Sequence, residues 1–313
     1  MPRRLPSLLL KTSLWVLAAL LAMVAVAVTY VLYNVYSFDT ETLPARHGQV
    51  DAQLFARDRG AQPLIVGLGG AEGGNSWTRD FWKPQRERFL DQGYAFLAIG
   101  YFGLPNTPAA LDRIALDGVH AAIQNAQQDP RVSSECVILL GGSKGGELAL
   151  AMAAHYPDID AVIALAPGDT VFPAHTDAMT TSSWSKDGQP LPFAPMPWSA
   201  TLDLLGGNLH AVMQRVLAQP EAEAARIPVE RMQAALLLVA ADKDEMWPSL
   251  WMAKRLMARL DAAGYAHARA LIEVDGDHAS PTRQFDQVEA FLQAQMSSRP
   301  GCGSATLPAQ TNR

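Results

Sequence analysis

Three side chains that could act together on an acyl group are spread over the second half of this sequence. Ser143 lies within Gly141-Gly-Ser-Lys-Gly145, which fits the G-x-S-x-G pattern of a nucleophile elbow. Asp244 and His278 follow it along the chain. A serine hydroxyl becomes an effective nucleophile when an imidazole takes its proton and a carboxylate orients that imidazole. These residue types therefore predict nucleophilic attack by a serine on an acyl group.

The histidine and the acid are chosen by their positions after predicted strands. His278 follows the last predicted strand, whereas His155, His175, His210 and His267 lie in predicted helices or in an insertion. The chain order Ser, Asp, His is that of α/β hydrolases.

Two acids compete for the role of orienting the histidine. Asp242 and Asp244 share the loop that follows a predicted strand at residues 235–240. We favour Asp244, because it stands deeper in the turn and its carboxylate can reach back toward a histidine. Asp242 would instead cap or brace the loop.

Backbone N–H groups are expected to hold the negative oxygen that forms during acyl transfer. A predicted strand at residues 63–68 runs into residues 67–74, where five of eight positions are glycine. One donor would be Gly70 or Ala71, and the other would be Lys144, the residue after the nucleophile. A phosphate-binding loop and a plain loop are the alternatives, although neither a Walker lysine pattern nor a spaced G-x-G-x-x-G follows.

Lys144 and Glu147 occupy the first turn of the helix predicted after Ser143. Their side chains could tune the approach of a substrate, but a solvated helix start is the commoner role for such residues.

Strands and helices alternate along most of the chain, which predicts an α/β-hydrolase fold with a mostly parallel sheet and helices on both faces. Strands are expected at residues 49–56 (an edge strand), 63–68, 94–99, 136–140, 160–165, 235–240 and 269–274. Helices are expected at residues 79–91, 107–128, after Ser143, at 201–218, 249–263 and 282–296.

Residues 168–230 interrupt this alternation and are rich in proline and aromatic side chains. An insertion of this size between core strands is usually functional, so we expect a lid over the active site. Its apolar side chains suggest a substrate with an acyl or other apolar portion. Alternatively, they only fasten the loop to the body of the domain.

The N-terminal region contains an uncharged run at residues 14–36, which is long enough to cross a bilayer as a helix. Arg3, Arg4 and Lys11 precede the run, and Asp39 and Glu41 follow it. The positive-inside rule then places residues 1–13 in the cytoplasm and the catalytic domain, residues 48–297, in a periplasmic or extracytoplasmic space. A cleaved signal peptide is the alternative. Residues 298–313 are expected to form a disordered tail.

The composition of the chain limits the size of its core and the partners, metals and cofactors that it could bind. The chain has 313 residues, of which 49% are hydrophobic, so it can bury one large α/β core. Its net charge of −6 argues against a nucleic-acid partner. Cys136 lies in a predicted core strand and Cys302 in the predicted tail, so a disulfide framework is improbable. No H-E-x-x-H or paired C-x-x-C is present, and we expect neither a metal nor a cofactor.

Four segments together resemble the C-terminal catalytic domain shared by acyl-CoA thioesterases and bile acid-CoA:amino acid N-acyltransferases. They are residues 100–105 (Gly-Tyr-Phe-Gly-Leu-Pro), 141–150 around Ser143, 241–249 around Asp244, and Gly-Asp-His278. The resemblance spans roughly residues 60–295. It implies a Ser/Cys, Asp, His triad, matched here by Ser143, Asp244 and His278, and attack on a thioester to give an acyl-enzyme.

The resemblance also favours hydrolysis, because the amino acid N-acyltransferases have cysteine where this chain has Ser143. Our leading hypothesis is a membrane-anchored serine hydrolase that cleaves acyl thioesters, with a small-molecule thioester or ester as its substrate. Hydrolysis of carboxylic esters, acyl transfer to an amine or alcohol, and a catalytically silent binding module are the alternatives. The oligomeric state stays open.

Overall fold

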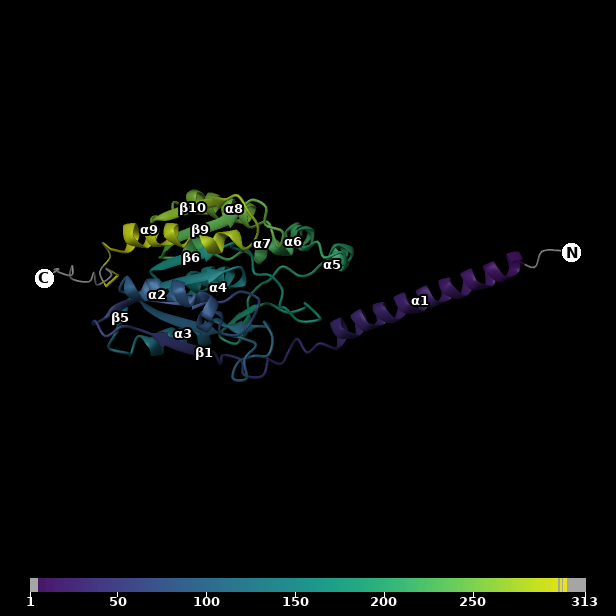
Figure 1. Ribbon diagram of the computed structural model, residues 1–313, viewed down its shortest axis with the longest axis horizontal. Helices are drawn as coiled ribbons and strands as arrows, with labels where there is room; N and C mark the ends of the chain where they lie inside the picture. Colours follow the sequence, from purple (N-terminus) through teal and green to yellow (C-terminus); the bar gives the residue numbers. More distant parts are fainter. Residues whose placement is uncertain (1–4, 298, 300, 303–313) are drawn as a thin grey trace.

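A seven-stranded sheet forms the centre of the molecule (Figure 1). The structure is a computed structural model that describes residues 5–297, 299 and 301–302. The strand order is β1-β3-β2-β5-β6-β9-β10, and β1 alone runs antiparallel to its neighbour in this sheet. The strands are β1 (Asp51–Phe55), β2 (Gln62–Leu68), β3 (Ala95–Gly100), β5 (Val132–Gly142), β6 (Ala161–Leu165), β9 (Ala235–Ala241) and β10 (Arg269–Val274).

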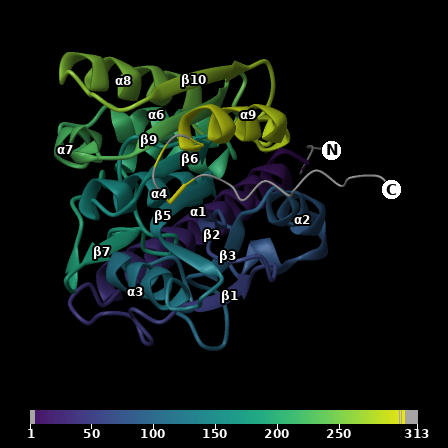
Figure 2. The same ribbon diagram turned by 90° about the vertical axis from the view of Figure 1, so that its left-hand side faces the viewer.

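Helices cover both faces of this sheet (Figure 2). Along β2, Leu64 and Val66 pack into one core while Ile65 packs into the other, because successive strand residues point to opposite faces. The first core is closed by α3 (Leu116–Ala126), α4 (Lys144–His155) and α8 (Ser249–Ala262), and the second by α2 (Lys83–Asp91) and α9 (Phe285–Met296). The predicted α/β-hydrolase architecture is confirmed.

The helix predicted at residues 107–128 is wrong in its first half, since α3 begins only at Leu116. Arg113 has φ 45°, in the left-handed region, and its N–H donates to the carbonyl oxygen of Ser182. The next residues form β4 (Ile114–Ala115), which pairs with β7 (Trp184–Lys186) and through it with β8 (Gln189–Pro190). Pairing with a distant segment therefore overrides the local helical pattern.

The helix predicted at residues 201–218 is split into α5 (Thr201–Leu205) and α6 (Leu209–Leu217). Gly207 has φ 72° between them, a conformation that glycine adopts without strain. Asn208 then caps α6 by accepting the N–H of Ala211 at 3.1 Å. The remaining short elements are η1 (Ser76–Thr78), η2 (Asp80–Trp82), η3 (Trp198–Ala200), α7 (Glu221–Ala224), η4 (Val229–Arg231) and η5 (Ser280–Arg283).

The predicted apolar span is part of a longer helix, α1 (Leu5–Ser37), which extends away from the domain (Figure 1). A stretch of 18 residues within residues 10–37 has a mean hydropathy of 2.5, and none of it is buried by the rest of the chain. By length and composition this helix can cross a membrane, although a signal sequence has the same properties.

The two cysteines form a disulfide, so the prediction that a disulfide was improbable is wrong. Cys136 near the start of the buried part of β5 is bonded to Cys302, and both side chains are fully buried. Arg299 holds the same segment by donating to the carbonyl oxygen of Asp160 at 2.7 Å. The start of the predicted disordered tail is thus bonded to the sheet, and residues 298, 300 and 303–313 lie outside the described residues.

Removal of this disulfide is expected to destabilise the domain. The bond joins residues 166 positions apart, and closing so long a loop restricts the unfolded chain, which is worth about 3–5 kcal/mol. Cys302→Ala should lower the free energy of urea unfolding of the full-length protein by that amount. Treatment of the native sequence with a thiol reductant is the matched control and should produce the same loss. Equal stability of oxidised and reduced protein would contradict this prediction.

Candidate active site

Ser143 lies at the turn between β5 and α4, with φ 53° and ψ −122°. A serine rarely adopts this conformation, so the surrounding structure must impose it. Its N–H donates to the carbonyl oxygen of Leu165 at 2.8 Å. A Cβ atom on Gly145 would overlap the carbonyl oxygen of Gly69, and one on Gly141 would overlap that of Gly145. The glycines of the predicted elbow are therefore required by the close approach of backbone segments.

Asp244 and His278 are brought together from the ends of β9 and β10. The Nδ1 atom of His278 lies 2.9 Å from each carboxylate oxygen of Asp244. Asp244 Oδ1 also accepts the N–H groups of Met246 and Trp247, at 3.0 and 3.2 Å. Burial alone would raise the pKa of Asp244, but the hydrogen bonds from His278, Ser249 and the Trp247 backbone hold this pKa below its usual value.

Asp242, the competing acid, has a different partner. Its Oδ1 atom accepts the N–H of Gly276 at 3.0 Å, which ties the loop after β9 to the loop after β10. Of the two acids, Asp244 is the one that contacts His278. Asp242 braces the loop instead.

Ser143 and His278 line one cavity of about 340 Å³. Gly70 and Thr282 also contribute to its wall. A cluster of aromatic side chains from η1 and η2 forms its apolar part, namely Trp77, Phe81 and Trp82. This cavity can hold a short apolar group next to the serine.

The insertion, residues 168–230, contacts the loop that carries Asp244 and not the wall of the cavity. The described residues that line the cavity do not include any from 168–230. Instead, Nδ1 of His210 on α6 lies 2.7 Å from the carbonyl oxygen of Asp244, so the insertion supports the loop that carries the acid. No pattern in the sequence indicates this contact, and the lid stays a prediction.

Glu72 is a residue of this site that the sequence pattern did not single out. Its Oε1 atom accepts the N–H of Gly70 at 3.2 Å and the hydroxyl of Ser76, and its side chain lines the same cavity as Ser143. A Cβ atom on Gly70 would lie 2.7 Å from Glu72 Oε2 and 3.5 Å from the Cβ atom of Ser143. A carboxylate thus holds the N–H of Gly70, which with that of Ala71 is one of the two candidates for the second oxyanion donor. Its position as the single charge within residues 67–74 is the signal that could have revealed it.

Lys144 and Glu147 form a buried ion pair, so the solvated helix start, the commoner of the two roles considered, is excluded. Their side chains are 2% and 0% exposed, and Nζ of Lys144 donates to Glu147 Oε2 at 2.7 Å. Glu147 Oε1 accepts the N–H of Phe172 at 3.1 Å and the indole N–H of Trp184 at 2.7 Å. Burial lowers the pKa of Lys144 and raises the pKa of Glu147, and each charge counteracts this effect on the other. The pair joins the first turn of α4 to the insertion.

One group of possible metal ligands is found among the described residues, and it lies away from this site. Asp160 is close to the sulfur atoms of Cys136 and Cys302. Because those sulfur atoms are bonded to each other, they do not provide the thiolates that bind metals.

The fold and the arrangement of these side chains define an α/β-hydrolase-type protein, and solved structures share the fold. A puromycin-hydrolysing peptidase from Mycobacterium tuberculosis is 15% identical, with a TM-score of 0.54 over 79% of this chain and 37% of that chain. Est1E from Butyrivibrio proteoclasticus, solved with ferulic acid bound, is 17% identical, with a TM-score of 0.52 over 80% of this chain and 96% of that chain.

The chain belongs to the BAAT / acyl-CoA thioester hydrolase C-terminal family, whose model matches residues 115–280. Human acyl-coenzyme A thioesterase 6 is 26% identical over 254 residues, which are 80% of this chain and 57% of that protein. Rat acyl-coenzyme A thioesterase 1 is 25% identical over 248 residues, which are 75% and 53% of the two proteins. The chain therefore spans about half the length of the curated relatives it matches. The resemblance inferred from the sequence is confirmed.

Breaking the buried ion pair should destabilise the start of α4. Lys144→Met leaves the Glu147 carboxylate buried without its cationic partner, which should lower the free energy of unfolding by about 3–5 kcal/mol. Addition of Glu147→Gln should recover part of this loss, because an amide oxygen can still accept the N–H groups of Phe172 and Trp184. Urea unfolding of the single and double variants measures both effects. A double variant less stable than Lys144→Met would contradict the prediction.

Proposed function

We propose that this protein is a membrane-anchored serine hydrolase that cleaves acyl thioesters through an acyl-enzyme on Ser143. The observation that carries the proposal is the Asp244–His278 pair beside the cavity that contains the strained Ser143. Membership of the thioester hydrolase family supports the choice of substrate class.

In the proposed first step, Nδ1–H of His278 donates to Asp244, which leaves Nε2 free to accept the proton of the Ser143 hydroxyl. Asp244 holds this tautomer and stabilises the imidazolium that forms. The serine oxygen bonds to the carbonyl carbon of the thioester. When the C–S bond breaks, the proton on His278 passes to the sulfur and the thiol leaves.

The negative oxygen of the tetrahedral intermediate would be bound by backbone N–H groups. One is that of Lys144, which the buried pair with Glu147 holds at the start of α4, and the other is that of Gly70 or Ala71. The N–H of Gly70 can bind the oxyanion only after its hydrogen bond to the Glu72 carboxylate breaks. Glu72 is solvent-exposed, so its side chain has room to turn away.

In the second step, His278 takes a proton from water, and the resulting hydroxide attacks the acyl-enzyme. The ester bond to Ser143 breaks, the serine regains its proton and the free acid leaves. The aromatic wall formed by Trp77, Phe81 and Trp82 would contact the acyl group.

The same proposal places α1 across a membrane, with its N-terminus in the cytoplasm and the catalytic domain on the periplasmic or extracytoplasmic side. The disulfide between Cys136 and Cys302 supports this topology, because disulfides persist in oxidising compartments and are rare in the cytosol. Coenzyme A is a cytosolic cofactor, so this topology also favours a second candidate, hydrolysis of an oxygen ester or another acyl donor by the same residues.

Turnover by the full-length protein in detergent tests the proposed chemistry. Acyl-CoA thioesters and 4-nitrophenyl esters of the same chain lengths should be compared, because they differ in the leaving group alone. Ser143→Ala should reduce turnover by about 10⁴-fold or more, and Asp244→Asn by about 10³- to 10⁴-fold. Asp242→Asn is the matched control and should cost less than about tenfold, because its carboxylate braces a loop. Undiminished turnover in Ser143→Ala would exclude this mechanism.

Glu72→Gln is expected to increase turnover. The carboxylate competes for the Gly70 N–H and places a negative charge close to the forming oxyanion, whereas an amide of the same size has no charge. We expect kcat to rise several-fold at neutral pH, because the activation free energy should fall by about 1 kcal/mol. Asp80→Asn removes a charge from η2 nearby and should leave kcat unchanged. A tenfold loss in Glu72→Gln would show that the charge assists the reaction.

A further inference from the structure

Three large apolar side chains are left uncovered on a short segment of the insertion. Trp198 in η3 is 60% exposed, and Leu202 and Leu205 in α5 are 81% and 79% exposed. Residues three and four apart lie on one side of a helix, so the spacing of these three places them together. We call them the α5 apolar surface. Soluble proteins rarely leave such a group of side chains in water without a partner.

The helix α5 lies on the α1 side of the domain. In Figure 1, α5 projects from the same side of the domain from which α1 departs. The catalytic residues also follow the carboxyl ends of β5, β9 and β10. Because these strands are parallel, all three ends lie at one edge of the sheet.

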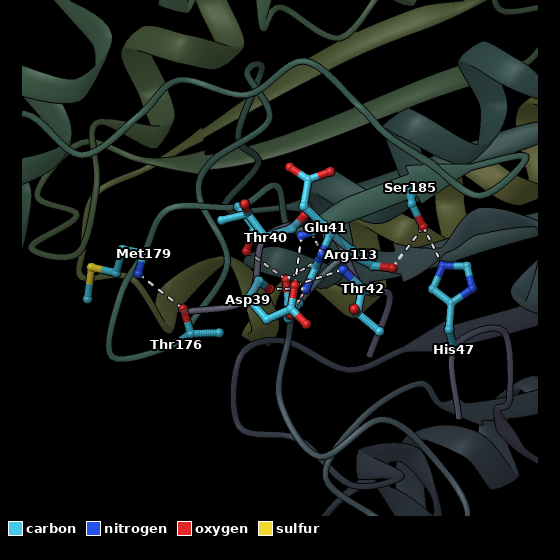
Figure 3. Close-up of polar contacts among 11 residues, drawn as sticks. Asp39, Thr40, Glu41, Thr42, His47, Arg113, Thr176, Met179 and Ser185 are labelled. Carbon is cyan, nitrogen blue, oxygen red and sulfur yellow. Dashed lines mark hydrogen bonds and ion pairs between the residues drawn. The ribbon is translucent and has the colours of Figure 1, made fainter. Parts of the chain in front are cut away.

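The linker after α1 is bound tightly to the domain. The guanidinium of Arg113, which is 2% exposed and paired with Asp112, donates to the carbonyl oxygens of Thr40 at 2.8 Å and Asp39 at 3.2 Å (Figure 3). Oδ1 of Asp39 in turn accepts the N–H groups of Glu41 and Thr42, at 2.9 and 2.8 Å. The linker is therefore an ordered part of the domain.

This attachment limits how far the domain can be from a membrane that contains α1. The helix ends at Ser37, and Arg113 binds Asp39 and Thr40. Three residues span at most about 10 Å. A domain bound at Thr40 must then lie against the headgroup layer, with the side that faces α1 closest to it.

We propose that the α5 apolar surface docks onto the lipid bilayer beside α1, with Leu202 and Leu205 in the boundary between headgroups and acyl chains. This inference rests on the membrane span of the proposed function. The bilayer is the partner because the linker already holds this side of the domain against it. Tryptophan suits the interface, since its ring is apolar and its N–H can reach water.

The charges on α5 indicate that binding to a bilayer would not require anionic headgroups. Asp203 is ion-paired with Arg215 of α6, so this part of the surface has no excess positive charge. The attraction would come from burial of apolar area. We therefore expect docking on zwitterionic phosphatidylcholine.

Docking of α5 would place the bilayer next to the catalytic acid. α5 and α6 are separated by Gly206, Gly207 and Asn208, and His210 of α6 contacts the carbonyl oxygen of Asp244 at 2.7 Å. The site would then receive its acyl substrates from the membrane surface, which favours amphiphilic donors.

A fluorescent label on α5 tests the docking without reference to turnover. Leu205→Cys introduces a free thiol into a chain whose two cysteines are bonded to each other, so an environment-sensitive dye can be attached there. The full-length protein is reconstituted into phosphatidylcholine nanodiscs with nitroxide-labelled lipid. Asp58→Cys, whose native side chain is 94% exposed in the turn between β1 and β2, is the matched control. We expect quenching at position 205 to exceed quenching at position 58 by about twofold or more.

A second substitution tests whether the apolar surface itself causes the docking. Leu202→Glu, added to the chain labelled at position 205, should reduce the quenching toward the value at position 58. Gln293→Glu on α9 adds the same charge elsewhere and should leave the quenching unchanged. Equal quenching at positions 205 and 58, in a protein that floats with lipid vesicles, overturns the docking but leaves the span intact. If the protein does not float with lipid vesicles, the proposed membrane span is wrong, and the docking inference is wrong with it. The hydrolase assay in detergent tests the proposed chemistry independently of both.

Discussion

The backbone conformation of Ser143 is the constraint on which the rest of the site depends. Its φ of 53° turns the chain sharply from β5 into α4. The loop after β2 packs directly on Gly145, where a side chain would overlap the carbonyl oxygen of Gly69, so the turn requires glycine at this position. The same contact brings Gly70 and Glu72 into the cavity beside the serine. One close backbone approach thus sets the position of the proposed nucleophile and of the groups around it.

Buried charged side chains connect the first turn of α4 to the insertion, and the linker after α1 to the domain. The pair of Lys144 and Glu147 fixes the first turn of α4, and Glu147 extends the connection to the insertion through Trp184. Arg113 performs a similar function for the linker after α1. Each pair forms within one segment, and its hydrogen bonds reach a distant one, namely the insertion in the first case and the linker in the second. These pairs therefore specify how the insertion and linker attach to the sheet.

The insertion, residues 168–230, contacts the loop that carries Asp244. In the described residues, the wall of the cavity comes from the loop after β2, from η1 and η2, and from the loops that carry Ser143 and His278. The insertion instead contacts the acid through His210 and presents exposed leucines on α5. Its position next to both the acid and the anchored linker is the basis for the proposed role at a membrane surface.

The sequence alone determined the order of the central strands along the chain, the family, the elbow and the choice of the candidate acid and histidine. Local patterns were sufficient there, because buried strands are continuous apolar runs and a glycine-rich turn between such a run and a helix is typical of an elbow. Only the tertiary structure decided that Cys136 pairs with Cys302, that residues 114–115 join a second sheet, that Lys144 and Glu147 are buried, and that Glu72 binds Gly70. Each of these features depends on segments that are distant in sequence or on the direction of a side chain. Neither periodicity nor residue type contains that information.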